Sequence, residues 1–456
     1  MTLIKSISGI RGTIGGKTGQ NLTPIDIAEC TAGFGMWIKE QGKTNKVVVG
    51  RDGRISGFMV SQIAVQTLLA MGIDVVDLDL STTPTVEMMV PKLRAGAGII
   101  FTASHNPVQW NALKFLNDRG EFISAEDGER ILSFIENKSL EFAGVNELGK
   151  YSRYEPHIQE HVEEIVAYPH VNAESIRAKK FKVVVDCINS TGAMAIPPLL
   201  EALGVEYILL NDKDFGHFAH NPEPLPVHLT ALSETVIREK AHLGISVDPD
   251  VDRLAFICED GSFFGEEYTL VAIADYMLTK NPGQTTVSNL SSSRALADVT
   301  RKHGGSYHAA SVGEVNVVKK MKETGAFIGG EGNGGVIVPD LHYGRDAMAG
   351  IALFLSYLAV KDKPLSQVKK DFPDYIIIKD KIDLINDDQV FSITEKLKKS
   401  FASEKIDETD GVKIDFTEGW VHLRKSNTEP IIRIYAESYT REQAEALIHK
   451  VKEQIN

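Results

Sequence analysis

Short runs of apolar, β-branched residues alternate with stretches of helical periodicity along most of this sequence. Apolar strands followed by helices are typical of mixed, largely parallel sheets that are covered by helices on both faces. We predict such strands at residues 46–49, 73–78, 98–101, 182–186, 207–210, 243–247, 285–289, 306–309 and 326–329. Thr23 and Pro24 supply a cap and a first-turn proline for a predicted helix over residues 25–40. The pattern predicts an α/β protein in which several similar units follow one another.

The pattern changes after residue 373, where a small α+β domain is predicted. Its expected elements are a strand at 375–379, a helix at 388–403, strands at 412–416, 420–424 and 431–437, and a helix at 441–454. A chain of 456 residues has room for at least three domains at about 150 residues each. With turn-rich segments as boundaries, we expect domains at residues 1–150, 151–258, 259–368 and 369–456.

Charge and cysteine content limit the partners and the compartment. Against 49 Lys and Arg stand 62 Asp and Glu, and the net charge of −13 disfavours nucleic acid and anionic membranes as partners. An anionic substrate therefore requires a local basic pocket. The cysteines, Cys30, Cys187 and Cys258, are widely spaced and lie in apolar stretches, which favours a reducing compartment over a zinc site or a disulfide framework. The longest apolar stretch, 348–360, is shorter than the roughly 20 residues of a membrane span, and we expect a cytoplasmic protein.

A serine motif follows the predicted strand at 98–101. It reads Thr-Ala-Ser-His-Asn-Pro and contains Ser104 and His105; Asn111 and Lys114 come shortly after it. A strand that delivers a serine into a polar loop is a place for an exposed hydroxyl nucleophile. In isolation the same residues are equally compatible with a turn whose side chains bond the backbone.

A carboxylate motif, Asp-Pro-Asp-Val-Asp-Arg, follows the predicted strand at 243–247. Asp248, Asp250 and Asp252 alternate, so in an extended segment they point toward one locus, where a hard cation such as magnesium or calcium offsets their repulsion. An EF-hand is disfavoured because Arg253 occupies the position that needs glycine. An aspartyl-nucleophile phosphatase is a less favoured alternative, and a merely solvated acidic turn would not normally separate two apolar strands.

A basic loop between two C-terminal strands concentrates phosphate-binding groups. It contains Arg424, Ser426, Asn427 and Thr428, and Arg433 follows. Guanidinium groups suit phosphate and hydroxyls complete such a site, although a solvated hairpin is the alternative. This loop is the basic pocket that the acidic total makes necessary.

Glycine and arginine mark three further loops. Residues 329–335 form a glycine-rich segment in which Glu331 and Asn333 are suited to sugar hydroxyls. Arg11 lies in a Ser-Gly-Ile-Arg-Gly segment near the start. For Arg51 and Arg54 a structural role through ion pairs or caps is favoured.

Together, and in this chain order, the motifs resemble those of the α-D-phosphohexomutase superfamily along the whole chain. The resemblance implies an isomerase with three related α/β/α domains and a C-terminal α+β domain around a central cleft. It also implies that Ser104 is carried as phosphoserine and that its phosphate, with Asp248, Asp250 and Asp252, holds Mg²⁺. A sugar 1,6-bisphosphate is the expected activator, and a phosphosugar is the expected partner of a monomer or homodimer.

We assign expected roles to residues on that basis. Ser104 transfers the phosphoryl group, Arg11 and Arg253 balance its charge, Lys114 is the favoured general acid or base, and His105 positions the serine loop because its side chain points elsewhere in an extended chain. The expected substrate-binding residues are Glu331, Asn333, Arg424, Ser426, Asn427, Thr428 and Arg433.

The segment around Arg11 and the chain length resemble the phosphoglucosamine mutase branch, which makes amino-sugar precursors of the cell wall. Two departures bear on the sugar: the loop after Glu331 ends in Asn-Gly-Gly, and Ala112 replaces a usual glycine. Phosphoglucomutase or phosphomannomutase activity stays the alternative. A catalytically silent sugar-phosphate sensor is the alternative from another class.

Overall fold

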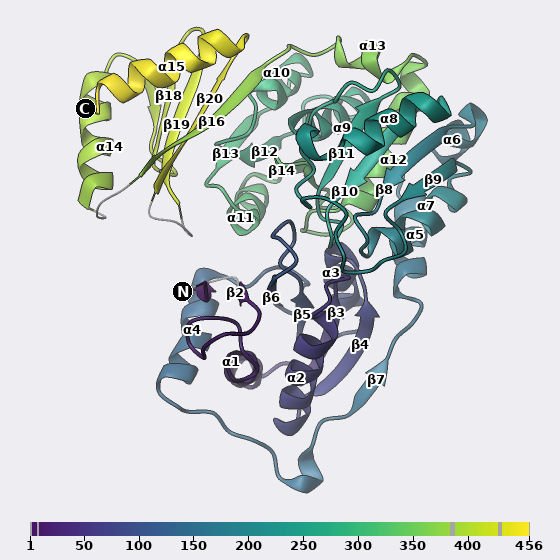
Figure 1. Ribbon diagram of the computed structural model, residues 1–456, viewed down its shortest axis with the longest axis vertical. Helices are drawn as coiled ribbons and strands as arrows, with labels where there is room; N and C mark the ends of the chain where they lie inside the picture. The colour runs from purple at the N-terminus through teal and green to yellow at the C-terminus, as the bar shows by residue number, and fades with distance from the viewer. Residues whose placement is uncertain (1, 7–8, 384–387, 427–430, 456) are drawn as a thin grey trace. The chain divides into compact units, whose positions relative to one another are not determined.

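The computed structural model describes residues 2–6, 9–383, 388–426 and 431–455 (Figure 1). The chain divides into two compact units. The first comprises residues 1–273 and 334–366, and the second comprises residues 274–333 and 367–456.

The first unit begins with a mixed sheet of seven strands in the order β1-β2-β6-β5-β3-β4-β7. The strands are β1 (Ile4–Ser6), β2 (Gly9–Thr13), β3 (Lys46–Arg51), β4 (Asp74–Leu80), β5 (Ala97–Phe101), β6 (Trp110–Leu116) and β7 (Tyr151–Arg153). β3 is parallel to β4 and β5, whereas β6 is antiparallel to β5 and β2. Because β7 pairs with β4, this sheet extends three residues past the boundary predicted at 150.

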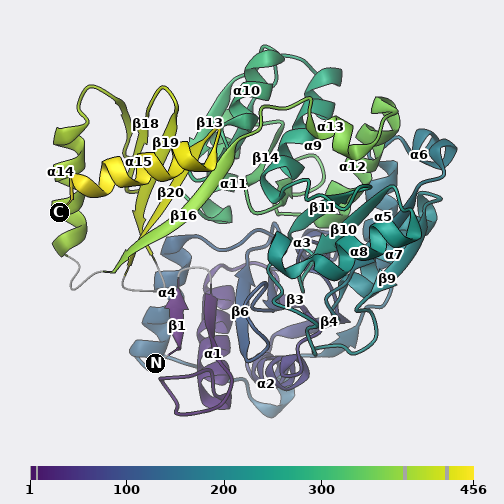
Figure 2. The ribbon, with the colours of Figure 1, turned by 45° about the horizontal axis from the view of Figure 1, so that its top comes forward.

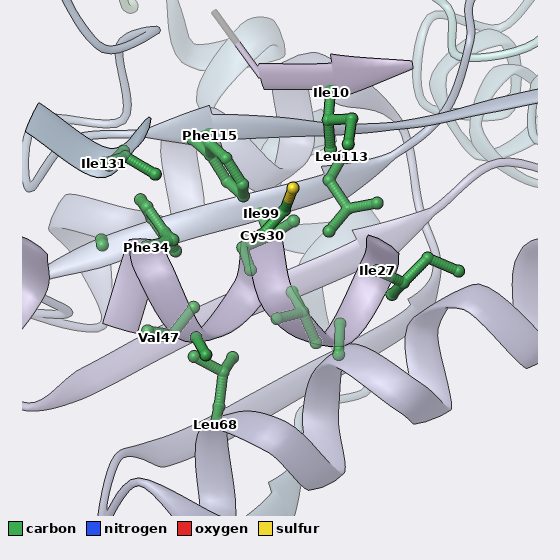
Figure 3. Packing of buried hydrophobic residues seen from close by; sticks show 14 of the residues in the cluster. Ile10, Ile27, Cys30, Phe34, Val47, Leu68, Ile99, Leu113, Phe115 and Ile131 are labelled. Atoms are coloured by element: carbon green, nitrogen blue, oxygen red, sulfur yellow. The ribbon is translucent and has the colours of Figure 1, made fainter. Parts of the chain in front are cut away.

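Alternating side chains of the central strands explain why helices cover both faces of this sheet. Val47 and Ile99 pack with α1 (Pro24–Glu40), α2 (Gly57–Ala70) and α4 (Ala125–Glu136), and Val48 packs with α3 (Thr83–Lys92). Figure 3 shows the α1 side, where Phe34 faces Phe115 with ring centroids 4.3 Å apart.

A second sheet of four strands follows in the same unit, in the order β11-β10-β8-β9. β8 (Lys182–Asp186) is parallel to β9 (Glu206–Leu210) and to β10 (Leu243–Val247), and β11 (Leu254–Cys258) is antiparallel to β10. The helices of this region are α5 (His157–Ala167), α6 (Ala173–Lys179), α7 (Gly192–Ala202) and α8 (Thr230–Glu239), with short 3₁₀ turns η1 (Val145–Glu147) and η2 (Pro226–His228).

The apolar stretch predicted to be too short for a membrane span is the buried helix α12 (Ala347–Lys361). It contacts α5, α6, α7 and β11, which explains why its apolar residues surround it on nearly all sides. Phe354 stacks on Phe256 of β11 with ring centroids 3.8 Å apart. Among the described residues, no helix is both long and apolar enough to cross a bilayer.

The third sheet has the order β13-β12-β14-β15, and β12 is parallel to both β13 and β14. Its strands are β12 (Thr286–Asn289), β13 (Tyr307–Ala310), β14 (Ile328–Glu331) and β15 (Gly335–Ile337). The accompanying helices are α9 (Glu266–Lys280), α10 (Ala295–Lys302), α11 (Glu314–Thr324) and α13 (Leu365–Lys369).

The C-terminal sheet has five antiparallel strands in the order β16-β20-β19-β18-β17. They are β16 (Ile376–Asp383), β17 (Lys405–Asp407), β18 (Val412–Asp415), β19 (Gly419–Lys425) and β20 (Ile431–Ser438). The helices α14 (Asp388–Ser400) and α15 (Arg441–Glu453) pack on its apolar face, and Figure 2 shows α15 running across the strands. The predicted fold class, mixed α/β sheets followed by an α+β domain, is confirmed.

Candidate active site

The serine motif forms a tight turn directly after β5. Ser104 has a φ of 48°, so the backbone adopts a left-handed conformation that turns the chain away from the strand. The Thr102 hydroxyl accepts a hydrogen bond from the Ser104 amide at 2.9 Å and donates one to Asp52 at 2.7 Å. These contacts fix the direction of a serine side chain that is largely buried.

Arg54 fixes the backbone of the serine loop through hydrogen bonds. Its guanidinium pairs with Asp52 at 2.9 Å, and the side chain is buried. It also donates to the carbonyl oxygens of four loop residues, at 2.5 to 2.9 Å: Ser104, Asn106, Pro107 and Trp110. Arg51 pairs with Asp79 at 2.6 Å. The structural ion pairs predicted for both arginines are confirmed, and Arg54 additionally shapes the serine loop.

The carboxylate motif lies between β10 and β11, as predicted, but it is not extended. Val251 has a φ of 61°, and its amide donates to the Asp248 carbonyl at 3.1 Å, so the segment is a turn. The carboxylates of Asp248, Asp250 and Asp252 are fully buried, and each offers an oxygen within 4.8 Å of the others. The predicted convergence is therefore correct, whereas the extended geometry behind it was wrong.

Asp248 connects this turn to the serine loop. Its Oδ1 accepts hydrogen bonds from the amides of Asp252 and Arg253, both at 3.1 Å. Its Oδ2 accepts a hydrogen bond of 2.6 Å from the Ser104 hydroxyl. Burial, and then the charges of Asp252 and Asp250, raise the pKa of Asp248 well above its ordinary value.

The other two carboxylates each use one oxygen for a fixed donor. Asp250 Oδ2 accepts from Thr83 Oγ1 at 2.7 Å and from Lys114 Nζ at 2.9 Å. Asp252 Oδ2 accepts from Arg345 Nη2 at 2.6 Å. The second oxygen of each, Oδ1, is buried and has no hydrogen-bond partner among the described residues. Buried oxygens without donors, beside Ser104 and Asp248, fit a hard cation such as Mg²⁺.

Cationic side chains surround the carboxylates. Lys114 lies on β6, and although burial opposes its charge, Asp250 and Asp252 raise the pKa of the ammonium group above its ordinary value. Burial, and then the charge of Arg253, lower the pKa of Arg11, which lies on β2 opposite Ala112. The structure therefore brings Ser104, Lys114, Asp248, Asp250 and Asp252 together by direct contact, and predicted Arg253 lies beside them with its Nε 3.9 Å from Asp252 Oδ1.

His105 lies closer to the serine than we expected. Because Ser104 is left-handed rather than extended, His105 Nδ1 is 3.4 Å from Ser104 Oγ. Burial, and then the charges of Arg253 and Arg345, lower the pKa of His105 well below its ordinary value. The extended backbone from which we separated the two side chains was wrong.

The predicted sugar-binding residues lie in the second unit. Gly329 and Gly330 belong to β14 itself, so the glycine-rich loop starts only after Glu331, which is a correction. A Cβ at Gly329 would lie 2.8 Å from the backbone oxygen of Val287 on β12, which cannot move aside, and this explains a glycine inside the strand. Glu331 is buried, and its Oε1 accepts hydrogen bonds from Asn289 Nδ2 and the Gly313 amide at 2.9 and 3.0 Å.

Asn333 lies two residues beyond β14. Its amide nitrogen donates to Glu331 Oε2 at 3.4 Å. The Gly332 amide, between them, donates to Ser292 Oγ at 2.9 Å. The two residues predicted to bind sugar hydroxyls, Glu331 and Asn333, therefore contact each other at the end of β14.

Two of the predicted phosphate-binding residues, Arg424 and Arg433, lie on adjacent strands of the C-terminal sheet, on the face opposite its apolar core. Arg424 of β19 is directly opposite Arg433 of β20, and Lys381 of β16 is opposite Arg433 on its other side. Like charges in such a row repel one another, which favours an anionic ligand above them. Arg433 Nε donates to Ser426 Oγ at 3.4 Å. Asn427 and Thr428 lie outside the described residues.

Sequence reasoning missed Thr83 and Arg345. Neither belongs to a recognisable motif of its own, and both reach the carboxylates only through the packing of α3 and of the segment before α12. The one available signal was charge, because three clustered aspartates require donors from elsewhere in the chain.

Family models match the chain in four consecutive segments. All four models are described as phosphoglucomutase/phosphomannomutase: alpha/beta/alpha domain I matches residues 3–141, domain II residues 159–261, domain III residues 265–375, and the C-terminal domain residues 383–454.

Curated relatives match over nearly the full length. A protein of Thermococcus kodakarensis named "Phosphoglucomutase/phosphomannomutase" is 35% identical over 95% of each chain. A Methanopyrus kandleri protein named "Probable phosphoglucosamine mutase" is 34% identical over 96% of this chain and 95% of its own. A crystal structure of a phosphoglucomutase/phosphomannomutase family protein from Burkholderia thailandensis superposes with a TM-score of 0.87, at 26% identity, over 99% of this chain and 96% of its own.

Proposed function

This chain belongs to the α-D-phosphohexomutase superfamily and is a phosphohexomutase, and we propose that its substrate pair is glucosamine 6-phosphate and glucosamine 1-phosphate. The observation that carries the mechanism is the contact between Ser104 and Asp248 within the carboxylate cluster. The amino sugar is supported by the Ser-Gly-Ile-Arg-Gly segment around Arg11 and by several relatives named "Probable phosphoglucosamine mutase" at 32 to 34% identity.

The phosphoryl group moves between Ser104 Oγ and the sugar. In the first step the bond from phosphorus to Oγ breaks and a bond from phosphorus to the free sugar hydroxyl oxygen forms. The sugar hydroxyl loses its proton. Ser104 Oγ takes up a proton as it separates from phosphorus, which restores the serine hydroxyl. The resulting 1,6-bisphosphate returns its other phosphoryl group to Ser104, so the enzyme ends the cycle phosphorylated. A free 1,6-bisphosphate would act as activator because it can phosphorylate Ser104.

The carboxylates, together with the serine phosphate, would hold Mg²⁺ through Asp248, Asp250 and Asp252. Bound there, the ion supplies Lewis-acid stabilisation of the charge that develops on the transferring group. Lys114 holds Asp250 in place and adds a positive charge beside it. Arg11 and Arg253 would contribute further positive charge near the phosphate.

Two groups are candidates for the proton transfer. His105 Nδ1 lies 3.4 Å from Ser104 Oγ, so the imidazole can exchange a proton with the serine oxygen. Lys114 is bound to Asp250 in an ion pair, a partner that favours its ammonium form, and in that form it can only donate a proton. We therefore propose Lys114 as the acid that supplies a proton to the leaving Ser104 Oγ and His105 as the residue that positions the serine loop, while the proton of the sugar hydroxyl passes to solvent.

Substrate binding would use the second unit. Arg424 and Arg433 suit the phosphate that does not react, with Ser426 as an additional donor, as Asn427 and Thr428 would be. Glu331 and Asn333 offer an acceptor and a donor for ring hydroxyls. Hydroxyls are common to several hexoses, so these residues do not by themselves select glucosamine.

The second candidate is phosphoglucomutase or phosphomannomutase activity, which the name of the Thermococcus kodakarensis relative favours. The test compares kcat/KM on the 6-phosphates of glucosamine, glucose and mannose, with Mg²⁺ and the matching 1,6-bisphosphate. We expect glucosamine 6-phosphate to be preferred at least about 10-fold, which corresponds to about 1.4 kcal/mol. A higher value on glucose or mannose would establish the second candidate, and no turnover of any of the three after priming would establish the sensor.

A further inference from the structure

Arg345 reaches the carboxylate cluster from a part of the chain that carries no recognised motif. It lies between β15 and α12 and is largely buried. A bridge pairs its backbone with Ile337, the last residue of β15. Its Nη2 donates to Asp252 Oδ2 at 2.6 Å. A cation from the third predicted domain therefore contacts a carboxylate of the second.

The contacts divide the oxygens of Asp250 and Asp252 into two sets. Oδ2 of each is held by fixed donors, which are Thr83 and Lys114 for Asp250 and Arg345 for Asp252. Oδ1 of each has no hydrogen-bond partner among the residues that the structure describes, although Arg253 Nε lies 3.9 Å from Asp252 Oδ1 and Lys114 Nζ lies 3.8 Å from Asp252 Oδ2. With one oxygen occupied, each carboxylate has only one left for a metal ion. This arrangement suits Mg²⁺, which prefers six separate ligands at short distances over carboxylates bound through both oxygens.

The segment that carries Arg345 is anchored by its neighbour, Asp346. Asp346 Oδ1 caps α12 by accepting the amides of Met348 and Ala349 at 2.8 and 3.0 Å. Its Oδ2 accepts from His161 Nε2 at 3.0 Å and from His342 Nε2 at 3.3 Å. The next amide, that of Ala347, donates to the Val251 carbonyl inside the carboxylate turn at 3.2 Å.

Helix α3 completes the same framework. The Thr83 amide donates to the Asp250 carbonyl at 2.9 Å, and Thr85 Oγ1 contacts His161 Nδ1 at 2.8 Å. Glu87 Oε2 lies 3.3 Å from His342 Nδ1. The ligand atoms of His161, His342 and Asp346 also lie within 4.8 Å of one another. Since both imidazoles direct a ring nitrogen at Asp346 within hydrogen-bonding geometry, this second cluster is a hydrogen-bonded anchor that fixes Arg345.

We propose that Arg345 is a positioning residue for the metal ligand Asp252: it limits Asp252 to one metal-binding oxygen and offsets part of the charge of the three carboxylates. The inference rests on the proposed metal-dependent mutase. Without Arg345, Asp252 turns both oxygens toward the cation and the site becomes more negative, so a divalent ion binds more tightly. The same change fills positions around the ion that the phosphoryl oxygens need, so turnover falls.

The test measures metal binding and turnover separately. Arg345→Gln keeps a hydrogen-bond donor but removes the charge, and Arg345→Lys keeps the charge. Mn²⁺ binding is followed by electron paramagnetic resonance of the free ion, without substrate. For R345Q we expect Mn²⁺ to bind at least 5-fold more tightly while kcat falls at least 10-fold. For R345K we expect Mn²⁺ affinity within 2-fold of wild type and a higher kcat than for R345Q.

The outcomes separate this inference from its premises. A merely structural Arg345 predicts weaker Mn²⁺ binding in R345Q, together with a lower urea midpoint, and unchanged binding would equally overturn the inference. Arg345→Met is the second variant if R345Q does not fold, with the same expectations. Arg153→Met is the matched control, since Arg153 is half exposed, pairs with Asp79 and should change neither quantity. If wild type binds no Mn²⁺ or has no mutase activity, the proposed function fails instead.

Discussion

Ser104 Oγ donates a hydrogen bond of 2.6 Å to Asp248 Oδ2, across 144 positions of sequence. The two residues follow strands of different sheets, β5 and β10, in the same compact unit. A phosphoryl group on Ser104 would therefore start its transfer beside three carboxylates whose remaining negative charge a divalent cation would offset. In the mechanism proposed above, this contact places Ser104 beside the proposed metal ligands before any substrate arrives.

Replacing Ser104 with Ala should abolish turnover because it removes the oxygen that carries the phosphoryl group. We expect kcat to fall at least about 1,000-fold, with a melting temperature close to that of wild type. Intact-mass spectrometry should find one phosphoryl group on wild type after priming and none on the variant. Ser133→Ala, at a partly exposed position of α4, is the control. A fully active S104A enzyme would contradict the proposed mechanism.

Removal of the metal should stop the reaction, and adding the metal again should restore it. EDTA should abolish turnover, and added Mg²⁺ should restore it, because Oδ1 of Asp250 and Oδ1 of Asp252 have no hydrogen-bond donor among the described residues and the clustered carboxylates then repel one another. Asp250→Asn should lower kcat at least about 100-fold in saturating Mg²⁺. The melting temperature with and without Mg²⁺ is an independent measurement. A wild-type melting temperature that Mg²⁺ does not change would contradict a metal site at this turn.

Loss of Arg54 should damage the serine loop. Arg54→Ala leaves Asp52 buried without its cation and removes donors from four loop carbonyls, so we expect a loss of about 3 to 5 kcal/mol in the free energy of unfolding. Arg51→Ala is the matched control, because its partner Asp79 is 38% exposed and such pairs contribute below about 1 kcal/mol. Urea titrations compare the two variants. Equal decreases in the free energy of unfolding for the two variants would show that Arg54 does not stabilise the serine loop more than an ordinary surface ion pair would.

Replacing Arg433 should weaken substrate binding more than chemistry. Arg433 lies between Arg424 and Lys381 in a row of cations, and a lost charge-assisted hydrogen bond costs about 1.5 to 3 kcal/mol. Arg433→Ala should therefore raise KM about 10- to 100-fold and leave phosphorylation of Ser104 by a bisphosphate largely intact. Arg301→Ala, an exposed cation on α10, is the control. An unchanged KM would remove the C-terminal sheet from phosphate binding.

The class of fold and the residues of the carboxylate turn could be predicted from the sequence because both depend on local pattern. β-Branched runs mark buried strands, and the three aspartates lie within five consecutive residues whatever conformation the backbone adopts. The backbone itself could not be predicted. A valine at φ of 61° is strained, and only surrounding contacts such as that between Ala347 and the Val251 carbonyl hold it there.

Contacts that depend on tertiary packing could not be predicted from the sequence either. Thr83 begins α3 and Arg345 precedes α12, and in sequence they look like a helix start and an ordinary loop residue. Each acquires a role only when three segments far apart in the chain meet around the carboxylates. The left-handed Ser104, which brings His105 beside the hydroxyl, is the same kind of effect on a smaller scale.

The anchor around His342 should make stability depend on pH in the alkaline range. Burial disfavours the imidazolium, but the hydrogen bond to Asp346 at the start of α12 and the charges of Asp346 and of Glu87 on α3 outweigh it and raise the pKa of His342 to about 10. The facing ring of His161 on α5 lies 6.3 Å away, centroid to centroid. Since the folded pKa exceeds the ordinary 6.5, the contribution to stability is fully present below pH 6.5 and is lost as the pH rises through about 10.

His342→Gln removes that charge, so the free energy of unfolding should fall by about 3 kcal/mol at pH 6. The difference between wild type and variant should shrink at pH 8 and nearly vanish at pH 10.5. Urea titrations at the three pH values measure it. His303→Gln is the control: that histidine pairs with Asp275 in the second unit rather than with Asp346 or Glu87, so its replacement should not reproduce the pH course expected for H342Q. A wild-type advantage over H342Q that stays constant from pH 6 to pH 10.5 would show that the imidazolium between Asp346 and Glu87 does not stabilise the anchor.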